Sequence, residues 1–157
     1  MYARRGNGTF AFRHTRLRRH DESGLPGESP GIITGVKPLN DANPDTLPLL
    51  DAAIIAGLRD VMAEEFTALI NTFLNDLLIQ LDRLQQAIDQ GSAAGVQPIA
   101  HKLKSSCGSL GAFRLAELMR QLEQAGRLNA LSGAADLLQR IQAVAGETCA
   151  GLRALPD

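Results

Sequence analysis

The sequence predicts an all-α protein, an antiparallel four-helix bundle with a short extra helix at its N-terminal end. Hydrophobic residues make up 45% of the 157 residues but aromatic residues only 4%. Leucine, isoleucine and alanine must therefore build the core, and this composition favours helices over a sheet. Apolar residues also recur every three or four positions along most of residues 51–152. The connections between these segments are short, which makes neighbouring helices antiparallel.

Residues 1–46 lack this periodicity. Six arginines and no acidic residue occur among the first 20 residues, and a Gly/Pro/Ser-rich stretch follows. We expect a disordered leader or linker here, with the folded domain spanning residues 47–157. A basic arm for nucleic acid is the alternative. The acidic residues from Asp21 onward, the absence of a regular spacing of aromatic residues between the basic ones and the net charge of -1 argue against it, so we expect no nucleic-acid partner.

Two amphipathic helices are predicted next. Asp51 is a good N-cap for the first, short one, and a break is expected near Met62-Ala63. A long helix then starts at Glu64 and ends at Gly91, a plausible C-cap. The apolar face of the short helix comprises Ile54, Ile55, Leu58, Val61 and Met62. That of the long helix comprises Phe66, Leu69, Ile70, Phe73, Leu74, Leu77, Leu78, Leu81, Leu84 and Ile88.

Pro98 decides where the third helix is expected to start. Proline lacks a backbone N–H and is comfortable only in the first turn of a helix. We therefore expect a start near Gly95–Gln97, or a kink there, which would place His101 close to a helix N-terminus that favours anions. Gly111 closes this helix, and a fourth runs from about Phe113 to Asn129. Ser132 is a candidate cap for the fifth helix, which ends before Pro156.

The two cysteines have no metal-type spacing and no secretory signal precedes them. We interpret Cys107 and Cys149 as small reduced hydrophobes in the core of a cytoplasmic protein. No apolar run is long enough to span a membrane, so no membrane insertion is expected. A monomer is the default expectation for the oligomeric state.

The third helix carries a candidate functional face. At 3.6 residues per turn, one face contains Ile99, Leu103, Cys107 and Leu110. The opposite face contains Gln97, His101, Lys104, Ser105 and Gly108. A histidine would thus point outward beside a fixed positive charge, on a surface that small residues keep open to a partner.

This stretch resembles the motif helix of the histidine-containing phosphotransfer (HPt) domain family. The family motif, approximately His-x-Leu-Lys-Gly-Ser-Ser-x-x-Leu-Gly-Ala, corresponds here to His101-Lys102-Leu103-Lys104-Ser105-Ser106-Cys107-Gly108-Ser109-Leu110-Gly111-Ala112. The resemblance covers roughly residues 47–157. One position departs from the pattern, because Ser105 replaces the usual glycine and narrows the approach to His101.

The resemblance implies a phosphorelay carrier in two-component signalling. His101 would accept a phosphoryl group from a receiver-domain aspartate and pass it to another, making the protein a phosphotransfer intermediate without kinase activity of its own. The implied partners are response-regulator receiver domains and a hybrid sensor histidine kinase. No cofactor is expected on this chain, since magnesium would belong to the partner receiver domain. The chain also lacks a Walker-type phosphate loop and a clustered acidic set for a metal.

Within that role the residues divide by chemistry. An unperturbed neutral imidazole is a nucleophile at neutral pH, and Lys104, one turn on from His101, would stabilise phosphoryl charge. Lys102 lies about 100° around the helix and would contribute a general positive field rather than a direct contact with the phosphoryl group. Glu123, on the next helix, could accept a hydrogen bond from the imidazole and orient it. Partner docking or support is expected from Gln97, Lys102, Ser105, Gly108 and Glu123.

Two other functions compete with phosphotransfer. A non-catalytic HPt-like helical adaptor would keep the shape without carrying phosphate, and Ser105 and Pro98 are the features that favour it. A hydrolase with His101 as base lacks a nucleophile and an orienting acid. The sequence leaves open whether the chain stands alone or is the C-terminal piece of a hybrid kinase.

Overall fold

The computed structural model describes residues 42–156, and every regular element in that range is helical. The predicted leader lies mostly outside the described residues. The elements are a 3-10 turn Pro44–Thr46, α1 Ala52–Met62, a 3-10 turn Ala63–Glu65, α2 Phe66–Asp89, α3 Ala93–Ser109, α4 Phe113–Arg127 and α5 Ala134–Arg153. The all-α prediction is therefore confirmed.

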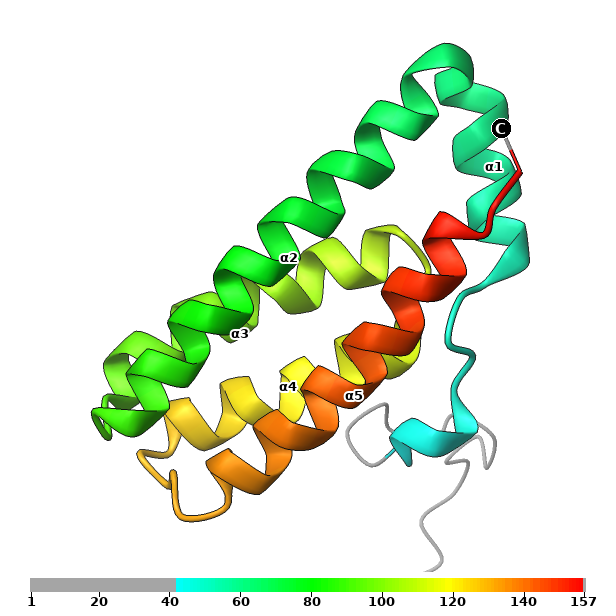
Figure 1. Cartoon of the computed structure of the whole chain (residues 1–157). Coiled ribbons are helices and arrows are strands. Elements are labelled where there is room, and N and C mark those ends of the chain that lie inside the picture. The colour runs from blue at the N-terminus through cyan, green and yellow to red at the C-terminus, as the bar shows by residue number, and fades with distance from the viewer. Residues whose placement is uncertain (1–41, 157) are drawn as a thin grey trace, which may run out of the picture. The chain divides into compact units, whose positions relative to one another are not determined.

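Helices α2 to α5 form an antiparallel bundle, with α1 as the extra N-terminal helix (Figure 1). Gly91 and Gly111, at φ 63° and 76°, occupy the left-handed region in the tight turns that precede α3 and α4. The bundle core is mainly aliphatic, as the composition predicts. Its side chains that are less than 2% exposed include Leu77, Leu84, Val96, Leu103, Cys107, Leu115, Leu118, Met119, Leu122, Leu138 and Ile141.

The first helix begins and ends as predicted. The Asp51 side chain accepts a hydrogen bond from the backbone N–H of Ile54 and caps α1. At the other end Ala63 has φ 44° and starts the short 3-10 turn, so the chain breaks between α1 and α2. The predicted apolar face of α1 is too wide, because Ile54 and Val61 are exposed. Leu78 of α2 is exposed as well, since a 3-4 repeat identifies a stripe more reliably than its edges.

The predicted start of the histidine helix is wrong. Helix α3 begins at Ala93, where Ser92 accepts a hydrogen bond from the N–H of Gly95, and Pro98 lies inside the helix. Pro98 has no backbone N–H to donate to the carbonyl of Ala94. Both Ala94 and Pro98 are exposed. Water can therefore solvate that carbonyl, which removes much of the penalty of an interior proline.

This correction removes one electrostatic argument. His101 lies more than two turns after the first residue of α3. The field of a helix terminus falls off within its first turn, so the α3 N-terminus does not supply positive charge to the imidazole. The predicted cap of α5 is also wrong, since Gly133, and not Ser132, occupies the N-cap position.

Candidate functional site

The site lies between α3 and α4, which approach each other closely at Gly126. A Cβ added to Gly126 would lie 3.0 Å from the backbone nitrogen and the Cβ of Gln97 and 3.1 Å from its Cα. Any larger residue would push the two helices apart. This contact brings Glu123, one turn before Gly126 on α4, opposite His101 on α3. Gln97, predicted as a support residue, thus lies at the point where α3 and α4 come closest at Gly126.

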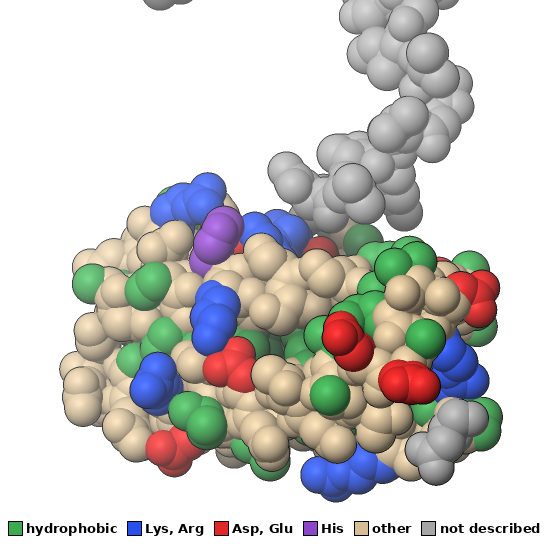
Figure 2. All heavy atoms as spheres, turned by 90° about the horizontal axis from the view of Figure 1, so that it is seen from above, with side chains coloured by type: hydrophobic (Ala, Val, Ile, Leu, Met, Phe, Trp, Pro, Cys, Tyr) green, Lys and Arg blue, Asp and Glu red, His purple; other side chains and the backbone are tan. Residues whose placement is uncertain are grey.

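His101 presents its ring to solvent while one ring nitrogen is held by the protein. Its side chain is 58% exposed, and Nδ1 lies 2.8 Å from Oε1 of Glu123. A carboxylate can only accept hydrogen bonds, so Nδ1 is the protonated donor nitrogen. In the neutral ring the lone pair is then on Nε2. Figure 2 shows the histidine at the surface among Lys and Arg side chains.

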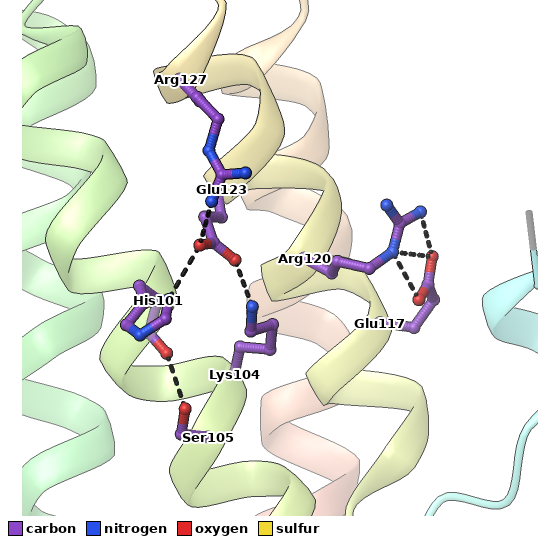
Figure 3. A network of polar contacts seen from close by, with 7 residues as sticks. All are labelled: His101, Lys104, Ser105, Glu117, Arg120, Glu123 and Arg127. Atoms are coloured by element: carbon purple, nitrogen blue, oxygen red, sulfur yellow. Dashed lines mark hydrogen bonds and ion pairs between the residues drawn. The ribbon is translucent and has the colours of Figure 1, made fainter. Parts of the chain in front are cut away.

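Glu123 is the shared partner of the cluster. Its side chain is only 4% exposed, and it accepts bonds from Lys104 Nζ at 2.6 Å on Oε2 and from Arg127 Nη2 at 3.0 Å on Oε1 (Figure 3). Burial raises the pKa of Glu123, but hydrogen bonds and charge from Lys104 and His101 outweigh it, and the net pKa is lowered. Glu123 is therefore a carboxylate at neutral pH.

The two lysines next to His101 have different partners, as their helix positions predict. Lys104 points toward α4 and Glu123. Lys102 points toward α2, where its ammonium lies 3.0 Å from a carboxylate oxygen of Asp76. The hydrogen bond from Lys102 lowers the pKa of Asp76 despite some desolvation. Only Lys104 therefore belongs to the polar cluster around the ring.

Ser105 and Gly108, the small residues of the predicted face, add little side-chain bulk to the surface beside His101. The Ser105 hydroxyl donates to the backbone carbonyl of His101 at 3.2 Å (Figure 3), so it turns along the helix. Nothing within 4 Å would meet a Cβ added to Gly108, so this position opens onto free space. Gly108 therefore leaves open space on this face, and the hydroxyl of Ser105, expected to narrow the approach to His101, lies along the helix backbone.

Arg127 was missed by sequence reasoning. Its four-residue spacing from Glu123 is a helical ion-pair signal, and that signal could have identified it once Glu123 had been singled out. Arg127 and Lys104 also line an open hollow of about 610 Å³ on the α4 side of the site. The other lining residues are Arg120, Gln121, Glu123 and Gln124.

Cys107 shares the motif helix but takes no part in the site. Its side chain is completely buried, as predicted. Burial raises the pKa of this thiol to about 12, and the nearby Cys149 adds a smaller contribution in the same direction. No cluster of three or more His, Cys, Asp or Glu side chains in residues 42–156 is suited to hold a metal ion. Within the same range, no helix has the length and apolarity required to cross a membrane.

Known proteins resemble this chain in sequence and in fold. The family model described as the Hpt domain matches residues 68–151. The crystal structure of histidine-containing phosphotransfer protein B from Pseudomonas aeruginosa is similar, with 28% sequence identity and a TM-score of 0.66. That match covers 68% of this chain and 92% of the other. No curated protein sequence matches this chain.

The helical bundle and these likenesses place the molecule in the class of phosphorelay histidine carriers. Within that class, the chain belongs to the Hpt domain family. The family match extends over most of α2, all of α3 and α4 and most of α5, so it includes both helices that carry the polar cluster.

Proposed function

We propose that the chain accepts a phosphoryl group on Nε2 of His101 from a receiver-domain aspartate and passes it to the aspartate of another receiver domain. The observation that carries this proposal is the contact between His101 Nδ1 and Glu123 on a ring that is mostly exposed. A ring anchored through one nitrogen presents the other to an incoming group in a fixed direction. Positioning of this kind accounts for much of the advantage of a bound nucleophile.

The transfer step follows from the protonation of the ring. The Nε2 lone pair attacks phosphorus, the bond from phosphorus to the aspartyl oxygen breaks, and the carboxylate leaves with the electron pair. The proton on Nδ1 stays, so the phosphorylated ring carries a positive charge next to Glu123. In the reverse direction the ring leaves as a neutral imidazole. Lys104 would stabilise the phosphoryl oxygens as a flexible cation.

The proposed partners are those that the family implies, and they would supply the groups that this chain needs for phosphoryl transfer. Receiver domains would supply the aspartates and the magnesium ion, and a hybrid sensor histidine kinase would supply phosphate upstream. Gln97, Lys102, Ser105 and Gly108 would support or contact the docked receiver around His101. We propose that the protein works as a monomer in the cytoplasm, without kinase activity of its own.

Incubation with a phosphorylated receiver domain and magnesium tests the proposal. We expect acid-labile, alkali-stable phosphate on the wild type and none on His101→Gln. Label on neither protein, while the receiver still binds, would favour a helical adaptor. Label of equal intensity on both proteins would place the acceptor elsewhere and contradict the proposal.

A further inference from the structure

The Glu123 carboxylate binds two cations through different oxygens. Lys104 contacts Oε2 at 2.6 Å, and Arg127 contacts Oε1 at 3.0 Å, the oxygen that also accepts from His101. In Figure 3 the two cations reach Glu123 from opposite sides, Lys104 from α3 and Arg127 from the next turn of α4. One buried anion therefore has two cationic partners.

The two cations differ in what they can do when phosphate arrives. Lys104 is 32% exposed on the helix of His101, and its flexible ammonium can turn toward a phosphoryl group. Turning away would leave the buried Glu123 short of a cation, and an unpaired buried charge is costly. Arg127 lies four residues after Glu123 on the same helix, α4. Its contact with Glu123 therefore does not depend on Lys104 or on α3.

We propose that Arg127 is a positioning residue for phosphorylation, a proposal that rests on the phosphocarrier role. Arg127 keeps Glu123 neutralised when Lys104 exchanges the carboxylate for the phosphoryl oxygens. Before phosphorylation, Glu123 has one negative charge and its two partners have two positive charges. The phosphoryl group adds further negative charge on the far side of the imidazole. With Arg127 in place, Lys104 can serve that group while Glu123 continues to accept from Nδ1.

A double-mutant cycle with phosphoramidate as donor tests this role without a partner protein. The rate of His101 phosphorylation, followed by intact-protein mass spectrometry, should fall about two- to fivefold in Arg127→Gln. Arg127→Lys should restore most of the rate, because lysine can also pair at this spacing. In a Glu123→Gln background, Arg127→Gln should have no further effect, since no carboxylate competes for Lys104.

Lys102→Gln is the matched control. It removes a positive charge beside His101 that contacts Asp76 and not Glu123, so any effect should be the same in both backgrounds. Equal effects of Arg127→Gln in the two backgrounds would overturn the inference and indicate direct or long-range action on phosphate. Lack of phosphorylation of His101 in the wild type would instead contradict the phosphocarrier role itself, so the two failures are distinguishable.

Discussion

Nδ1 of His101 on α3 and Oε1 of Glu123 on α4 lie 2.8 Å apart, which joins an exposed ring to a buried carboxylate. The hydrogen bond fixes both the direction of the ring and the position of its proton. It depends on the close packing of α3 against α4, so the geometry of the bundle determines which nitrogen faces solvent.

Glu123→Gln tests the role of the carboxylate. The amide oxygen can still accept from Nδ1, but the negative charge that stabilises a positive ring is lost. We expect phosphorylation of His101 to slow about tenfold, close to the lower end of the contribution of hydrogen bonds to charged groups. Nitrogen-15 NMR of the imidazole should show Nδ1 protonated in the neutral wild-type ring and a mixture of tautomers in the variant. An unchanged rate with an unchanged tautomer would show that the charge has no role.

Lys104→Ala and Lys102→Ala distinguish the two lysines beside His101. Only Lys104 lies in the cluster with Glu123, whereas Lys102 pairs with Asp76. Lys104→Ala should slow phosphoryl transfer about tenfold, and Lys102→Ala less than about threefold, since exposed charge pairs contribute little. The comparison is made by single-turnover transfer from a phosphorylated receiver. Equal effects would mean that the phosphoryl cation has been assigned to the wrong residue.

Gly126→Ala should disturb the site through packing alone. The added methyl group would lie 3.0 Å from the backbone nitrogen of Gln97, so α3 and α4 must separate. We expect a loss of about 1–3 kcal/mol in the free energy of unfolding, typical of overpacking, measured by urea denaturation. Phosphorylation of His101 should slow as well, because Glu123 moves with α4.

Gly146→Ala provides the control for that substitution. Gly146 also lies inside a helix, α5, but a Cβ there would meet nothing within 4 Å. Alanine should leave stability unchanged or raise it, since glycine is the poorer helix former. Similar losses in the two variants would show that the close approach at Gly126 is not what matters.

The pH dependence of stability follows from the lowered pKa of Glu123. A carboxyl group whose pKa is lower in the folded state stabilises the fold above its unfolded value, ordinarily 4.5, and loses that contribution as pH falls through the folded value. The free-energy difference between wild type and Glu123→Gln should therefore be fully present above pH 4.5 and shrink as pH falls below that value. Asp76 titrates in both proteins and cancels in the comparison. A difference independent of pH would contradict this account.

The sequence predicted the bundle because its signals are local and repeated. A long 3-4 repeat, an N-cap at Asp51 and glycines at the turns all act within one helix or connection. The start of α3 was misplaced because solvent exposure around Ala94 and Pro98 is a tertiary property. The pairing of Glu123 with Lys104 could not be predicted either, because it depends on the packing of α3 on α4. Arg127 was within reach of the sequence, since its spacing from Glu123 is local.

The most direct test of the central claim is the identity of the phosphorylated atom. Wild-type protein is treated with phosphoramidate, the modified residue is mapped by mass spectrometry at alkaline pH, and the ring is examined by phosphorus and nitrogen NMR. We predict one phosphoryl group, bonded to Nε2 of His101, with the proton on Nδ1 retained. Phosphate on Nδ1, or none on His101 with any phosphoryl donor, would contradict the account.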